Sequence, residues 1–125
     1  MEYYFAPMEG VTGAEYRAVH HRHFPGVDRY YMPFITPTQD RVFTPRELRN
    51  IAPERNVGYC AVPQLLTKNA GDFNWAAGEL WAMGYDEVNL NLGCPSGTVT
   101  AKGKGAGMLA DLEGLDRFLD GIFSA

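Results

Sequence analysis

The sequence has little cysteine, no long apolar run and no excess of basic residues. Its two cysteines, Cys60 and Cys94, stand far apart in different settings, which argues against the disulfide framework of small secreted domains and indicates a reducing compartment. No stretch approaches the roughly 20 apolar residues of a membrane span, and no basic leader followed by an apolar stretch opens the chain. We therefore expect a cytoplasmic protein without a membrane partner.

The charge balance gives no sign of a nucleic-acid partner. The chain has 11 basic and 15 acidic residues, a formal net charge of -4 at pH 7, whereas RNA is usually met by clustered Lys and Arg. Its 125 residues, 46% of them apolar, suffice for one domain with a buried core. Composition alone therefore predicts a small globular domain and weighs mildly against RNA binding.

Four short apolar runs predict β-strands. They lack the strict alternation of apolar and polar residues found in a sheet exposed on one face, and this is typical of parallel strands covered on both faces. Cys60 falls inside the third run and is expected in the core. The predicted strands cover residues 3–8, 29–35, 57–66 and 87–92.

Segments with helical spacing alternate with these runs. The first opens at Thr12, with Glu15 three residues later in the pattern of a capping box. Its Tyr16, Val19 and His20 fall on one face. Of the histidines at its end, only the pair formed by His20 and His23 has helical spacing, and no cysteine or carboxylate cluster joins them. We expect a solvated helix end there and no metal site.

Three further helices are predicted. A short one follows Thr44, and Pro45 suits its first position. The next covers residues 69–83 and ends at Gly84, and the last covers residues 111–123. The apolar faces of these two consist of Phe73, Ala76, Ala77, Leu80 and Met83 in the former and Leu112, Leu115, Phe118, Leu119 and Ile122 in the latter.

The regular alternation of strand and helix predicts an α/β fold of parallel βα units. Such units build either an open doubly wound sheet or a barrel, and a full barrel takes about 250 residues and eight units. The chain has about half of each. We therefore expect residues 1–125 to form four βα units, half of a TIM-type (β/α)8 barrel.

Polar residues stand at the carboxyl ends of the predicted strands, where parallel α/β folds bind ligands. Gln64 lies near the end of the third strand. Asn89 and Asn91 share one face of the fourth, because alternate side chains of a strand point the same way. Cys94 follows between a glycine and a proline, a setting that would restrain its backbone at the mouth of the fold.

Four strings resemble the tRNA-dihydrouridine synthases in order and spacing. They are Ala6-Pro7-Met8 with Gly10-Val11-Thr12, then Pro63-Gln64, then Asn89-Leu90-Asn91-Leu92-Gly93-Cys94-Pro95, and finally Lys102-Gly103-Lys104-Gly105-Ala106-Gly107. The most specific is the Asn-Leu-Gly-Cys-Pro string with the glycine-rich loop behind it. The resemblance covers essentially the whole chain and implies a βα barrel that carries FMN at its mouth, followed by a helical tRNA-binding domain.

The resemblance also implies the residues that bind the flavin. Pro7, Met8 and Glu9 would line FMN largely through backbone, and Gln64 would hydrogen-bond the flavin ring. Glu9 departs from the family, because many relatives have a small residue there, and its carboxylate would weaken or retune flavin binding. Further flavin contacts of the family, including a lysine on the following strand, would lie beyond residue 125.

For the substrate, the resemblance places Asn91 against the uracil and makes Cys94 the proton donor. Reduction of the 5,6 double bond of uridine needs a hydride, which no side chain supplies, so a redox cofactor must provide it. An ordinary cysteine thiol, with a pKa of about 8.5, stays protonated at neutral pH. The implied mechanism is reduction of FMN by NADPH, hydride transfer to C6 of uracil, and protonation of C5 by Cys94.

The glycine-rich loop 103–107 lacks the Gly-Lys-Ser or Gly-Lys-Thr of a phosphate-binding P-loop and does not follow a strand directly. We interpret it as a mobile active-site flap, with Lys102 and Lys104 as candidate substrate contacts to phosphate. A merely flexible loop is the alternative interpretation.

Two other hypotheses about the whole chain stay open. The chain is an inactive half-barrel fragment whose two unpaired edge strands are closed by a second copy in a homodimer, or it is a flavin-dependent dehydrogenase that acts on a free pyrimidine. The Cys-Pro turn and the glycine-rich loop favour the tRNA enzyme over the latter.

Overall fold

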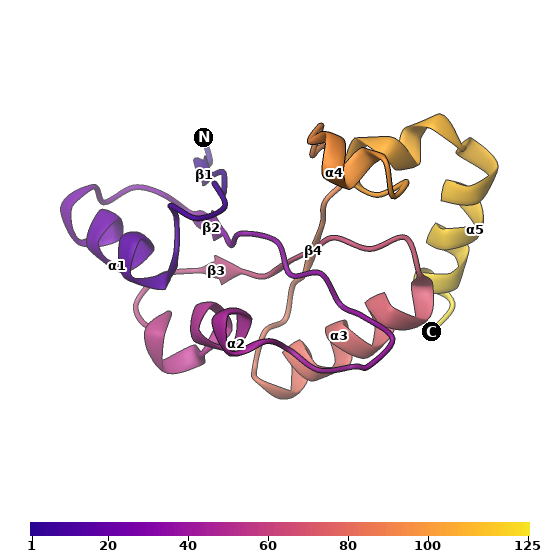
Figure 1. Ribbon diagram of the computed structural model, residues 1–125. Coiled ribbons are helices and arrows are strands. Elements are labelled where there is room, and N and C mark those ends of the chain that lie inside the picture. Colours follow the sequence, from indigo (N-terminus) through magenta and orange to yellow (C-terminus); the bar gives the residue numbers. More distant parts are fainter.

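The computed structural model describes all 125 residues as a mixed α/β chain with parallel strands (Figure 1). Each predicted strand and helix contains an observed one, so the α/β class is confirmed. The strands are β1 (Tyr4–Phe5), β2 (Arg29–Tyr31), β3 (Ala61–Val62), β4 (Gln64–Leu65) and β5 (Asn89–Leu90). The helices are α1 (Ala14–His23), α2 (Pro45–Ile51), η1 (Pro53–Arg55), α3 (Ala70–Ala82), α4 (Gly97–Thr100), η2 (Gly105–Ala110) and α5 (Leu112–Phe123).

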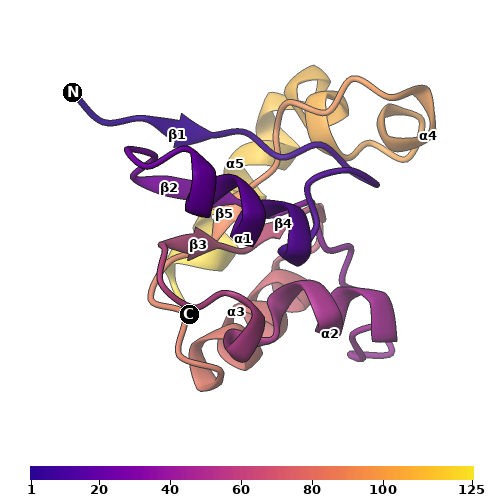
Figure 2. The same cartoon turned by 90° about the vertical axis from the view of Figure 1, so that its left-hand side faces the viewer.

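The strands pair in parallel and in chain order. β2 lies between β1 and β3 in one sheet, and β4 pairs with β5 in the other, with Gln64 opposite Asn89. A bridge between Ile35 and Leu65 links the chain after β2 to β4. Figures 1 and 2 show α2 and α3 on the same side of these strands. The carboxyl ends of neighbouring strands therefore lie close together.

The third predicted strand is shorter than expected and is split in two by Pro63. Proline has no N–H to give to a ladder, so pairing is interrupted at that residue. The Pro63 carbonyl still accepts a hydrogen bond from the Asn89 N–H at 2.8 Å, which keeps the neighbouring strand in register. At the other end, Gly58 adopts a φ of 90° in a turn, and the strand begins only at Ala61.

Side-chain caps fix the starts of three helices at the predicted places. Thr44 and Glu47 form a reciprocal capping box at α2, with Pro45 at the first helical position. Asn69 caps α3 and Asp111 caps α5, each accepting the backbone N–H of the residue three positions on at 2.9 Å.

The start and the packing face of α1 differ from the prediction. Gly13 is the N-cap and makes no side-chain bond there. The Thr12 hydroxyl instead accepts the Met8 N–H at 2.8 Å and donates to the Met8 carbonyl at 3.1 Å. Val19, on the predicted face, is 58% exposed, whereas Arg17 is fully buried.

Arg17 ties α1 to the segments around it. One guanidinium nitrogen donates to the Thr12 carbonyl at 2.8 Å. The other donates to the Asn50 carbonyl at 2.9 Å and to Asn56 Oδ1 at 2.8 Å. A planar guanidinium with several fixed donors suits such a site. Through it, α1, the end of α2 and the turn after η1 hold one another in place.

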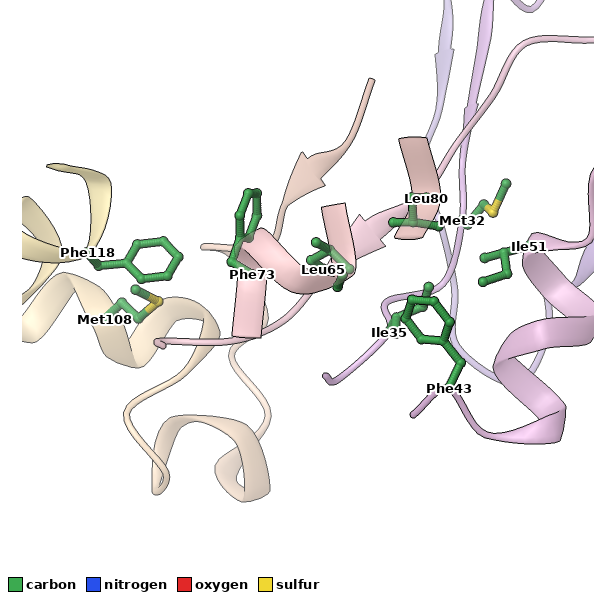
Figure 3. Packing of buried hydrophobic residues seen from close by; sticks show 10 residues of the cluster. Met32, Ile35, Phe43, Ile51, Leu65, Phe73, Leu80, Met108 and Phe118 are labelled. Atoms are coloured by element: carbon green, nitrogen blue, oxygen red, sulfur yellow. The ribbon is translucent and has the colours of Figure 1, made fainter. Parts of the chain in front are cut away.

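One apolar cluster forms the core beneath the strands (Figure 3). The third and fourth predicted helices supply much of it: Phe73, Ala76 and Leu80 of α3 and Phe118 of α5 are buried as expected. Leu112, by contrast, is 67% exposed. The buried cluster consists of Met32, Ile35, Phe43, Ile51, Leu65, Phe73, Ala76, Leu80, Met108 and Phe118.

The prediction that Cys60 lies in the core is wrong. Cys60 immediately precedes β3, and its side chain is exposed. Its carbonyl accepts the Tyr30 N–H at 2.8 Å, so its backbone belongs to the sheet although its thiol does not belong to the core. An apolar run is buried only as far as neighbouring elements cover it, and here the covering begins at Val62.

Candidate active site

An open cavity of about 710 Å³ lies at the carboxyl ends of the strands. It brings together the chain after β1, the chain after β2, β4, and the segment from β5 to α4. The predicted residues Pro7, Met8, Glu9, Gln64, Asn91 and Cys94 all line it. Pro33, Phe34 and Val99 line it as well, although the sequence analysis did not single them out. Six predicted site residues from three separate strings therefore meet in one place.

A chain of side-chain amides crosses the floor of this cavity. Gln64 Nε2 donates to Asn89 Oδ1 at 2.8 Å, and Asn91 Nδ2 donates to Gln64 Oε1 at 2.9 Å. Gln64 is buried, so these bonds satisfy an amide that would otherwise be costly to bury. Each amide nitrogen carries two hydrogens, so Gln64 and Asn91 each keep one N–H that is not used in the chain of amides. These are donors suited to a carbonyl oxygen.

Asn91 also shapes the turn that carries the cysteine. Its Oδ1 accepts the Gly93 N–H at 3.2 Å and the Cys94 N–H at 3.0 Å. On the other side, the Cys94 carbonyl accepts the Ala106 N–H at 3.1 Å. The Cys94 side chain is half-buried and makes no disulfide. Its backbone is thus held from both sides, and Cys94 lines the same cavity as the amides of Gln64, Asn89 and Asn91.

In the turn after β1, the N–H groups of Glu9 and Gly10 form no hydrogen bond within the chain, and of these two residues only Glu9 lines the cavity. Both the N–H and the carbonyl of Met8 are engaged by Thr12, and that carbonyl also accepts from Val11. The Glu9 carboxylate lies 3.8 Å from Arg46, which offsets part of the negative charge that the sequence places here. Glu9, more than Met8, is therefore the backbone donor that this turn offers to the cavity.

One comparison with known proteins identifies the family of the chain. The family model described as "Dihydrouridine synthase (Dus)" matches residues 4–124. The chain belongs to the dihydrouridine synthase family. This family implies oxidoreductase activity, its members depend on a flavin, and it acts on tRNA. A comparison with curated proteins found no match.

Lys102 and Lys104 do not line the cavity that holds the six other family positions. They flank Gly103 in the segment between α4 and η2, and the predicted glycine-rich loop contains the start of η2 rather than irregular chain throughout. Lys102 is exposed and Lys104 is half-buried. The two lysines therefore lie outside the cavity and beside the segment that supports Cys94.

Gly105 completes the support of Cys94, a role that no motif in the sequence predicts. Gly105 is buried and has a φ of 55°, a conformation that favours glycine. A Cβ there would lie 2.8 Å from the Cys94 carbonyl oxygen and 3.1 Å from Cys94 Cβ. The signal in the sequence was the repeated glycine of the string 103–107, which was interpreted as mobility although Gly105 serves close packing.

The histidines of α1 take part in packing rather than in a site. His20 Nδ1 lies 2.9 Å from the Tyr30 hydroxyl, and its ring packs against Phe5 and Phe24. His20 therefore differs from the expected solvated residue, while His23 is exposed as predicted. No three His, Cys, Asp or Glu side chains lie close enough to hold a metal ion. None of the helices combines the length and apolar character needed to span a membrane.

Proposed function

We propose that the chain works as the amino-terminal part of a tRNA-dihydrouridine synthase, in the FMN- and NADPH-dependent reduction of uridine to 5,6-dihydrouridine in tRNA. The observation that carries this proposal is the meeting of Gln64, Asn91 and Cys94 in one cavity at the carboxyl ends of parallel strands. The family match over residues 4–124 supports it independently.

The residues around the cavity fit a flavin. The volume of the cavity, about 710 Å³, lies within the roughly 300–1,000 Å³ typical of cofactor sites. The edge of a flavin ring presents carbonyl and N–H groups, and the free N–H of Gln64 and the Glu9 backbone N–H are donors for such groups. We assign Pro7, Met8, Glu9 and Gln64 to the flavin. When bound and reduced by NADPH, FMN supplies the hydride that no side chain provides.

We assign Asn91 and Cys94 to the uracil. The free N–H of Asn91 can donate to a uracil carbonyl, which orients the ring beside the thiol. Hydride addition at C6 leaves an electron pair at C5, and the Cys94 S–H bond breaks as its proton forms the new C5–H bond. The two bonds that Asn91 accepts from the turn restrain the Cys94 backbone and would help to place the thiol beside a bound ring. A uridine inside folded tRNA would first have to leave its stack.

We also propose that residues 1–125 form half of a (β/α)8 barrel. The parallel order of the strands supports this, and so do the open edges at β1 and β5, which a closed barrel does not leave. The missing strands would come from the rest of such a barrel, which in this family precedes a helical tRNA-binding domain. A homodimer in which two copies cover each other's edges is the second arrangement we propose.

The test begins with the visible absorption of the purified chain during titration with FMN. A bound-flavin spectrum is expected, followed by bleaching with NADPH and by dihydrouridine formation in an unmodified tRNA transcript. The Cys94→Ala variant should still bind FMN and be bleached by NADPH, yet lose formation of dihydrouridine. Light scattering on the same samples gives the mass of the flavin-bound species and so tests the homodimer.

The outcomes separate the candidate functions. Oxidation of the reduced flavin by free uracil or uridine, with tRNA left unchanged, would favour the free-pyrimidine dehydrogenase. Absence of flavin binding at high FMN concentration would overturn the assignment of a working reductase to this chain and leave the half-barrel fragment.

A further inference from the structure

All three lysines of the chain lie in one place. Lys68 directly follows the buried end of the β4 segment, 34 positions before Lys102 in the sequence. In the structure, Lys68 Nζ lies 3.4 Å from the position that a Cβ on Gly103 would take, and Gly103 stands between Lys102 and Lys104. Figure 1 shows the segment between β4 and α3 running next to the segment that carries α4. We call Lys68, Lys102 and Lys104 the lysine cluster.

No lysine of the lysine cluster forms an ion pair within the chain, whereas Arg29, Arg46, Arg55 and Arg117 each pair with a glutamate. Burial, followed by the charge of Lys102, lowers the pKa of Lys104, with Asp72 acting in the opposite direction. The chain as a whole has a net charge of -4, yet all of its lysines lie together and without ion pairs. The lysine cluster is therefore a locally basic site on an acidic protein.

A cavity of about 440 Å³ adjoins the cluster. Lys68 and Arg117 line it, together with Gly103 and the N-caps of α3 and α5, Asn69 and Asp111, so that one carboxylate stands beside the two cations. Helices of 13 and 12 residues thus begin at its wall, and the N-terminal ends of helices favour negative charge. Cationic side chains and helix starts around one cavity are suited to oxygens of a phosphate group.

The cluster lies beside the candidate active site and not inside it. None of its lysines lines the cavity of Cys94. Lys104 directly precedes Gly105, and Gly105 packs on the Cys94 backbone. Gly105 is thus the one residue in the chain that connects the lysine cluster to the support of Cys94. A phosphate bound here would flank the base in the cavity, as backbone phosphates flank a base that has left its stack.

We propose that the lysine cluster and its cavity form a docking site for backbone phosphates of the RNA substrate, next to the uridine that is reduced. The inference rests on the proposed function for the identity of the RNA. Lys102 and Lys104 are expected substrate contacts from the sequence, while the structure adds Lys68 and the cavity. The contact is independent of base sequence, because it reads phosphate alone.

The experiment compares tRNA binding by two triple variants at several salt concentrations. One replaces the cluster, Lys68→Gln, Lys102→Gln and Lys104→Gln. The control removes the same charge from exposed arginines that form no ion pair, Arg22→Gln, Arg41→Gln and Arg49→Gln. Binding of a labelled, unmodified tRNA transcript is followed by fluorescence anisotropy, and FMN titrations are run on the same proteins.

Each phosphate contact contributes roughly 0.9 or less to the slope of log affinity against log salt. The cluster variant should therefore lose about 2 to 3 units of slope, and between about 50 and 200 mM salt its affinity should fall some 30-fold less than that of the wild type. The control should keep most of the wild-type slope. The affinity for FMN should not change in either variant.

An unchanged slope in the cluster variant, or an equal loss in both variants, would overturn the proposal. Loss of FMN binding with unchanged RNA binding would overturn it too, because the phosphate bound here would then be that of the flavin. RNA binding that depends on the cluster, without any reduction of uridine, would contradict the proposed function and support the docking site. Reduction of uridine, together with an unchanged salt slope in the cluster variant, would support the proposed function and overturn the docking site.

Discussion

Gly105 lies against the backbone of Cys94, with no room between them for a side chain. A Cβ on Gly105 would approach the Cys94 carbonyl oxygen to 2.8 Å and Val99 Cγ1 to 2.9 Å. The next residue, Ala106, donates its N–H to the same carbonyl at 3.1 Å. The start of η2 thus supports the turn that presents the thiol, and Gly105 is a positioning residue for Cys94.

Gly105→Ala is therefore expected to displace the thiol. Gly103→Ala is the matched control, because Gly103 also has a positive φ, 65°, but a Cβ there meets only the flexible Lys68 side chain at 3.4 Å. Both changes carry the cost of alanine in a left-handed conformation, about 1 kcal/mol. In a Cys60→Ser background, the rate of Cys94 alkylation should change several-fold in Gly105→Ala and little in Gly103→Ala. Equal rates in the two variants would contradict the positioning role.

Asn91 and Gln64 are expected to separate positioning of the thiol from binding of the ring. Asn91→Ala removes the acceptor for the N–H groups of Gly93 and Cys94, while Gln64→Ala leaves that acceptor in place. Asn91→Ala should change the Cys94 alkylation rate and destabilise the fold by about 1–3 kcal/mol. Gln64→Ala should keep the alkylation rate and weaken FMN binding. Uridine reduction should fall by about tenfold or more in both, since each loses a donor to a ring carbonyl.

The elements that could be predicted from sequence are those that local rules determine. The cap of α2 needs only Thr44, Pro45 and Glu47, and the stripe of α3 needs only the spacing of its apolar residues. That the candidate site residues lie close together was also predictable, because parallel strands place their carboxyl ends at one edge of the sheet. Gln64 and Asn91 meet there as expected.

The features that were missed depend on contacts between distant segments. Nothing local indicates that Arg17 is buried, since its partners include Asn50 and Asn56, more than 30 positions away. Cys60 stands in an apolar run, yet no neighbouring element covers it. The interruption at Pro63, by contrast, follows from the missing N–H of proline and was predictable from the residue alone.

Arg17 should be required for the stability of the fold. Arg17→Ala leaves the Thr12 carbonyl without its side-chain donor and takes one of two side-chain donors from the Asn50 carbonyl, which keeps Asn56 Nδ2. Arg17→Lys replaces a planar fork with a single ammonium group. We expect the free energy of unfolding to fall by about 2–4 kcal/mol in the former and by at least about 1 kcal/mol in the latter. Denaturant titration measures this. The control Arg22→Ala, at an exposed position of the same helix, should stay within about 0.5 kcal/mol of wild type.

Tyr85 should make the fold sensitive to alkaline pH. Its hydroxyl donates to the Ile51 carbonyl at 2.7 Å, and burial raises its pKa from the ordinary 10.0 to about 12. Because the folded-state pKa is above the unfolded one, the stabilising contribution is complete below pH 10 and is lost as pH rises toward 12. A difference of this size corresponds to about 2 kcal/mol once partial exposure is considered.

The measurement is denaturant unfolding at a series of pH values from pH 8 upward, through the unfolded pKa of 10.0 and toward the folded pKa of about 12. Tyr85→Phe loses the hydrogen bond to the Ile51 carbonyl, so its free energy of unfolding should be lower than that of the wild type at pH 8. Because phenylalanine cannot ionise, the free energy of unfolding should then decline less steeply above pH 10. Tyr59 and Tyr30, whose pKa values burial also raises, keep some slope in both proteins. Tyr3→Phe, at a position 59% exposed, should follow the wild-type curve. Parallel curves for wild type and Tyr85→Phe would show that the Tyr85 hydroxyl ionises as readily in the folded chain as in the unfolded one.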